Sequence, residues 1–163
     1  MRSCNWNVVV EITGEERSMF ALQRIRRAIV IEAENLESTD PASARLLVSG
    51  LDRSVAGLLA IEDSAFRSIR RYPSLEPLIA QAVAESFYVR GLLERLEATE
   101  FSHSDWPGIV GDLLEAVEIH IDRLERSVLP SAFELMNAGD AAELGRLLGP
   151  PEAFRTQTNS SAA

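Results

Sequence analysis

The side chains that could perform chemistry are few, because the 163-residue chain contains only two histidines and one cysteine. His120 lies between Val117 and Leu124 at helical spacing, so it is expected to face the interior of a helical core. Glu62 and Ser86 interrupt two other apolar stripes in the same way. Burying a carboxylate or an imidazole is costly unless the group is paired, neutralised or bound to a metal. Glu62 and His120 are therefore the first candidates for a site.

Three interpretations of His120 are open from the sequence alone. It could be a neutral core histidine bonded to Glu62 or to a backbone carbonyl, a ligand of a residual metal site, or an exposed side chain. The other histidine, His103, stands between two serines and is expected in a surface turn. No nucleophilic triad, phosphate-binding loop or dinucleotide fingerprint occurs, and neither histidine has the Glu-x-x-His spacing of ferritin-like sites. We therefore expect no catalytic residues.

Charge and composition exclude several classes of partner. The net charge of -9, from 25 acidic and 16 basic residues, disfavours binding to nucleic acid or anionic lipid. A basic cluster at Arg67, Arg70 and Arg71 falls where a helix should end, where cations complement the helix dipole. The lone Cys4 cannot form an internal disulfide. With no membrane-spanning run and no secretory signal, a soluble protein of the cytoplasm is expected.

Helix start and stop signals then supply the elements that must position these residues. Thr13 and Glu16 form a capping-box pattern, and Asp40 before Pro41 joins an N-cap to a proline at the first helical position. Asp105 is expected to cap a later helix. These signals predict helices over residues 14–37, 41–71, 74–98, 106–137 and 139–149.

The predicted fold is all-α, an antiparallel up-down-up-down four-helix bundle over residues 14–149 that ends in a short helix. Residues 1–13 are expected to form an ordered N-terminal arm, because a run of three valines favours an extended conformation. Residues 150–163 are small and polar and should be disordered. A chain of this length can bury one apolar core without disulfides or a structural metal.

Two segments near the end of the chain carry a family resemblance. Residues 120–130, HIDRLERSVLP, are similar to a last-helix signature in which a ligand histidine precedes acidic residues and an apolar pair ending in proline. Residues 137–148, NAGDAAELGRLL, are similar to a short acidic closing helix. Residues 46–148 thus resemble a bacterial hemerythrin-like, or HHE cation-binding, domain. The resemblance implies a four-helix bundle around a non-haem diiron centre, and it places Pro130 inside a helix that the proline should kink.

Most ligand positions of that family are changed in this chain. Leu58 stands at the histidine position that precedes Glu62, and Ser86 replaces the histidine that should follow Glu85. Leu124 stands where many members have a ligand glutamate. The first helix offers only arginines, Arg26 and Arg27, near the expected histidine.

The resemblance leaves Glu62, His120 and Glu125 as possible metal ligands. A bridged diiron pair needs more donors than these three, although iron or another single divalent ion accepts mixed carboxylate and imidazole ligands. Glu125 follows His120 by five residues and points about 140 degrees around the helix from it. Convergence of all three on one ion thus depends on the tertiary structure.

Two functions follow from the resemblance. The first is a hemerythrin-like domain that has lost its diiron centre, needs no cofactor and acts as a non-catalytic binding, scaffold or sensory module for an unknown protein partner. Trp6, Trp106 and Phe154 would be candidates for its contact surface, although Trp106 is expected instead to pack against the end of the bundle.

The second function is an iron-binding protein with a reduced carboxylate and histidine site, related to oxygen or nitric oxide sensing or to iron handling. Close approach of Glu62 and His120, with Glu85 or Glu32 nearby, would favour it. An ion pair between Glu62 and an arginine such as Arg27 would favour the first function instead.

Overall fold

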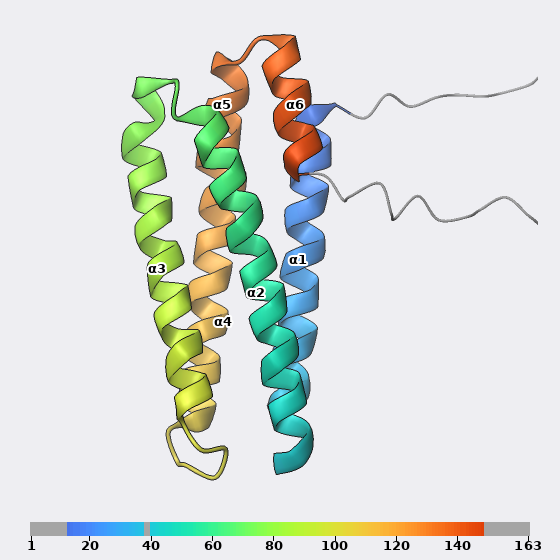
Figure 1. Cartoon of the computed structure of the whole chain (residues 1–163), viewed down its shortest axis with the longest axis vertical. Coiled ribbons are helices and arrows are strands. Elements are labelled where there is room, and N and C mark those ends of the chain that lie inside the picture. Colours follow the sequence, from blue (N-terminus) through green and yellow to red (C-terminus); the bar gives the residue numbers. More distant parts are fainter. Residues whose placement is uncertain (1–12, 38–39, 149–163) are drawn as a thin grey trace, which may run out of the picture.

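The computed structural model describes residues 13–37 and 40–148, and within these ranges the chain is helical with no β-strand. The predicted all-α class is confirmed. The long helices lie side by side along one axis (Figure 1). The elements in chain order are α1 (Gly14–Glu37), α2 (Pro41–Ile69), the 3-10 turn η1 (Pro73–Leu75), α3 (Glu76–Ala98), α4 (Trp106–Arg123), the π-helical turn η2 (Leu124–Val128), α5 (Leu129–Leu135) and α6 (Ala138–Leu148). The arm expected over residues 1–13, except Thr13, and the tail expected over residues 150–163 lie outside the described residues.

Side-chain caps determine where several helices begin. Thr13 Oγ1 accepts from the Glu16 amide at 3.2 Å, and the Glu16 carboxylate accepts from the Thr13 amide at 2.8 Å, which confirms the predicted capping box. Asp40 accepts from the Ser43 amide at 3.2 Å. The Asp105 carboxylate, in contrast, makes no capping hydrogen bond to α4. Asp105 is the N-cap residue of α4, as predicted, but its backbone angles are helical and its side chain does not cap the helix.

The predicted helix over residues 106–137 is interrupted. The Leu129 amide donates to the Leu124 carbonyl five residues earlier, which widens the helix by one residue at η2. Pro130 follows immediately and has no amide hydrogen to continue the regular pattern. Another break separates α5 from α6, whose first turn is capped by Asn137 through a 3.0 Å bond from the Asp140 amide.

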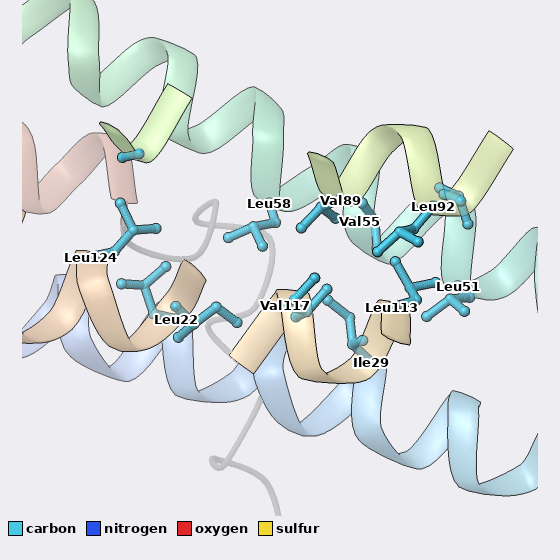
Figure 2. Packing of buried hydrophobic residues seen from close by; sticks show 14 of the residues in the cluster. Leu22, Ile29, Leu51, Val55, Leu58, Val89, Leu92, Leu113, Val117 and Leu124 are labelled. Atoms are coloured by element: carbon cyan, nitrogen blue, oxygen red, sulfur yellow. The ribbon is translucent and has the colours of Figure 1, made fainter. Parts of the chain in front are cut away.

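One apolar core runs along the length of the molecule and is supplied by every long helix. Leu22 and Ile29 come from α1, Leu58 from α2, Ile79 from α3 and Leu113 from α4, and each is at most 2% exposed. Figure 2 shows several of these side chains directed into the space between the helices. Trp106, considered above as a contact-surface candidate, is buried and packs edge to face on Phe101 with ring centroids 4.9 Å apart.

The short helix α6 packs against α1 at the end where α1 begins (Figure 1). The two backbones touch at a pair of glycines, since a Cβ atom on Gly145 would overlap the backbone of Gly14. Asp140 of α6 also accepts a hydrogen bond from the Tyr72 hydroxyl at 2.9 Å and pairs with Arg71 at 2.9 Å. Among the described helices, none has both the length and the hydropathy that a membrane crossing requires.

Candidate functional site

Glu62 and His120 meet inside the core. Glu62 comes from α2 and His120 from α4, and both side chains are buried. His120 Nε2 lies 2.9 Å from Glu62 Oε2. The Ser86 hydroxyl of α3 lies 2.7 and 2.9 Å from the two Glu62 carboxylate oxygens and 2.9 Å from the Ala82 carbonyl, so its single proton has three acceptors within reach. The three polar residues that interrupt the apolar stripes of the sequence thus form one cluster.

The opposite ring nitrogen of His120 faces a second carboxylate. His120 Nδ1 lies 3.4 Å from Glu85 Oε2, and Arg123 Nε donates to Glu85 Oε1 at 2.5 Å. The order Glu62, His120, Glu85, Arg123 alternates negative and positive groups when the imidazole is protonated. This chain of bonds ties α2, α3 and α4 together.

The surroundings of His120 act on its protonation in opposite directions. Burial lowers the pKa of the imidazole, but the hydrogen bonds and charges of Glu62 and then Glu85 outweigh burial, so the pKa of His120 lies above its ordinary value. The geometry agrees with this direction, because each ring nitrogen faces a carboxylate oxygen and a carboxylate can only accept a hydrogen bond.

Glu125 belongs to a different cluster, at η2. Its carboxylate accepts a 2.7 Å hydrogen bond from Gln23 Nε2 of α1 and lies 3.5 Å from the guanidinium of Arg26. Arg26 also pairs with Asp122 at 2.6 Å. Burial raises the pKa of Glu125, and the charge of Arg26 counteracts part of that rise. Arg26 and Gln23 of α1 thus compensate the charge of Glu125, which lies apart from the cluster of Glu62 and His120.

Two positions where the resemblance implies metal ligands, Leu58 and Leu124, are apolar and closed. Leu58 and Leu124 are 0% and 4% exposed, and with Leu22 they line a residual cavity of about 10 Å³ beside Glu62. Such a volume is at the lower limit for a single water molecule, and an ion with several protein ligands needs more room. Apart from Glu62, the residues that line this cavity are apolar, so the cavity offers no second metal ligand.

The donors that converge do not fit a diiron centre. In the part of the chain that the structure describes, no group of three or more His, Cys, Asp or Glu side chains is arranged to hold a metal ion. Glu85 cannot share an ion with Glu62 through His120, because the two carboxylates face opposite ring nitrogens. Glu62 and His120 Nε2 are close enough to bind one ion together, with the Ser86 hydroxyl beside them.

No family model matches this chain, and neither the curated proteins nor the solved structures compared with it include a match.

The sequence indicated Glu62, Ser86 and His120 through their positions on apolar faces, but it did not indicate the partners Arg123, Gln23 and Arg26. Gln23 and Arg26 are three residues apart on α1, beside Leu22, and this spacing was the available signal. His103 is exposed in the turn before α4, as predicted, where its Nδ1 accepts from the Asp105 amide at 3.2 Å.

Proposed function

We propose that this chain is a hemerythrin-like, up-down-up-down four-helix bundle that has lost its diiron centre and acts as a non-catalytic binding, scaffold or sensory module. The observation that supports the proposal best is the apolar closure at Leu58 and Leu124. Leucine at these positions fills the interior and leaves no unsatisfied ligand group, which stabilises a core that binds no metal.

The remaining polar residues support the same proposal. Glu62 and His120 bond to each other, and Glu85 and Arg123 complete the chain of charges. Glu125 has its own counter-ion in Arg26. Each buried carboxylate is thus compensated by protein groups, which is what a structural polar network requires.

An alternative function is favoured by one observation. His120 Nε2 faces Glu62, while Nδ1 faces the Glu85 carboxylate, and metal-binding histidines are commonly oriented by a carboxylate in this way. The close approach of Glu62 and His120 with Glu85 nearby was the arrangement expected for a reduced iron site. Arg27, the arginine expected to pair with Glu62 in a scaffold, is exposed and makes no such pair.

The test is elemental analysis of the purified protein before and after anaerobic incubation with ferrous iron, together with its visible spectrum and melting temperature. The proposed function predicts a colourless protein with no near-stoichiometric metal and no thermal stabilisation by iron. Near-stoichiometric iron that is lost in both Glu62→Ala and His120→Ala would overturn it in favour of the iron-binding alternative. The exposed His103→Ala variant is the matched control and should behave as the wild type.

A further inference from the structure

A cavity of about 230 Å³ opens between α2 and α3, on the outer side of the Glu62 and Ser86 pair. Its lining combines apolar side chains with charged ones, and Glu62 and Ser86 lie at its inner end. Its volume is just below the roughly 300–1,000 Å³ that is usual for ligand sites, so it suits a small molecule. The lining residues of α2 and the following turn are Leu59, Glu62, Asp63, Phe66 and Arg70, and those of α3 are Val83, Ser86, Phe87 and Arg90.

A large aromatic side chain at this cavity is left in water. Phe87 is 71% exposed, although it borders the half-buried Leu59 and Val83 of the cavity wall. Exposure of a phenyl ring is unfavourable, and an apolar ligand in the cavity would cover part of it.

Two arginines that line the cavity have no counter-ion among the described residues. Neither Arg70 nor Arg90 forms an ion pair or a side-chain hydrogen bond with any described residue. Their neighbours differ, since Arg67 pairs with Asp63 at 3.2 Å and Arg71 pairs with Asp140. A free guanidinium presents a planar set of donors that matches a carboxylate.

The two arginines lie toward opposite ends of the cavity. A tight turn joins α2 to α3, so the two helices run in opposite directions (Figure 1), and the bond between Ser86 and Glu62 sets their register. Arg70 follows Glu62 by eight residues and Arg90 follows Ser86 by four. At a rise of 1.5 Å per residue, their backbones are about 18 Å apart along the helix axes. The arginine side chains can extend inward over part of that distance.

We propose that this cavity binds an elongated small molecule with a carboxylate at each end and an apolar middle. The inference rests on the proposed binding function and gives it a ligand class. The two carboxylates pair with Arg70 and Arg90, and the apolar middle covers the exposed Phe87. The middle must be uncharged, because it passes Glu62, whose carboxylate would repel an anion there.

The probe is octanedioate, titrated into the full-length, metal-free protein by isothermal calorimetry, with octanoate as the one-ended comparator. Octanedioate should bind saturably at one site and about tenfold more tightly than octanoate. Arg70→Gln and Arg90→Gln should each weaken octanedioate binding about tenfold. Both residues are exposed, so both variants should fold. Arg95→Gln, an exposed arginine of α3 outside the cavity, is the matched control and should bind as the wild type.

A second pair of variants tests the apolar middle. Phe87→Ser should weaken octanedioate binding, whereas Tyr88→Ser, which removes the adjacent exposed ring outside the cavity lining, should not. Absence of octanedioate binding, equal binding of octanoate, or equal weakening by Arg95→Gln would each overturn the proposal. Iron binding is measured on the same protein, and its outcome decides the proposed function separately, because none of these variants replaces Glu62 or His120.

Discussion

His120 joins three helices because each of its ring nitrogens faces a carboxylate from a different helix. A buried ion pair contributes little compared with a well-packed apolar pair, yet removal of one partner is costly because the other charge is left uncompensated. The cluster of Glu62, Ser86 and His120 is therefore better viewed as a constraint on how α2, α3 and α4 align than as a large source of stability.

His120→Leu should lower the free energy of unfolding by about 3–5 kcal/mol, because the Glu62 carboxylate then stays buried without its partner. The double variant Glu62→Leu with His120→Leu should recover most of that loss, since both polar groups are replaced by apolar ones. Urea denaturation of the wild type, the two single variants and the double variant measures the coupling. If the double variant loses the sum of the single losses, the two residues are not coupled as the structure indicates.

The raised pKa of His120 predicts a pH-dependent part of the stability. An unfolded histidine has a pKa of about 6.5. Because the folded pKa is higher, the stabilisation is fully present below about pH 6.5 and is lost as the pH rises through the folded-state pKa. The groups that face the ring are Glu62 of α2 and Glu85 and Ser86 of α3.

The measurement is the difference in unfolding free energy between the wild type and His120→Gln from pH 5.5 to 9. The difference should favour the wild type most at the acid end and shrink toward alkaline pH. NMR titration of the His120 ring gives an independent value of its pKa. A ring pKa below that of an unfolded histidine would contradict the proposed ion pairing.

At the scale of elements, α1 is attached to the turn η2 through charge as well as apolar contact. Arg26 pairs with Asp122 of α4 and with Glu125 of η2, and its Nε is buried without a hydrogen-bond partner. The π-helical turn places Glu125 against α1, whereas His120 one turn earlier faces Glu62 and Glu85. Two acidic clusters that lie close together in the sequence thus face different helices.

Arg26→Gln should destabilise the protein by about 1–3 kcal/mol, because the buried Glu125 loses its counter-ion. The loss should be smaller at acid pH, where Glu125 becomes protonated. Arg27→Gln is the matched control, since Arg27 is exposed and makes no ion pair with the described residues. Equal melting temperatures for the two variants would show that the Arg26 cluster contributes no stability.

The contact between α1 and α6 depends on the absence of side chains. Gly145→Ala should cost about 1–3 kcal/mol, because the added methyl group would overlap the Gly14 backbone and separate the two helices. Gly91→Ala on α3 meets no atom within 4 Å and should instead stabilise the protein by about 0.5–1 kcal/mol. Thermal unfolding of both variants is the measurement, and a neutral Gly145→Ala would mean that α6 is not held this closely.

At the scale of the whole molecule, the net charge of -9 produces repulsion that the compact state must overcome. The Debye length falls from about 30 Å at 10 mM salt to about 8 Å at 150 mM, so added salt screens the repulsion between distant surface charges. Partly buried ion pairs such as Arg123 with Glu85 are screened less. We therefore expect the melting temperature to rise by about 2–4 °C between these salt concentrations. A fall in melting temperature would mean that favourable surface ion pairs outweigh the net repulsion.

The sequence by itself determined the helical class, most helix boundaries and which polar residues face the core. Helical periodicity, the caps at Thr13 and Asp40 and the prolines at helix starts are local signals, and each acts within a few residues along the chain. The position of Glu62 and His120 on apolar stripes likewise required burial and a polar partner. The π-helical turn before Pro130 was only partly foreseen, since proline predicts a disturbance but not its form.

Only the tertiary structure decided which partners these residues take. The pairing of Glu125 with Arg26, of Glu85 with His120 and Arg123, and of α6 with α1 joins residues that are far apart in the sequence, such as Gly14 and Gly145. These pairings depend on helix register and rotation, because a shift of one residue turns a side chain by about 100 degrees around its helix. Local sequence signals do not contain that information, so only the tertiary structure shows that Glu62 and His120 lie in one cluster and Glu125 in another.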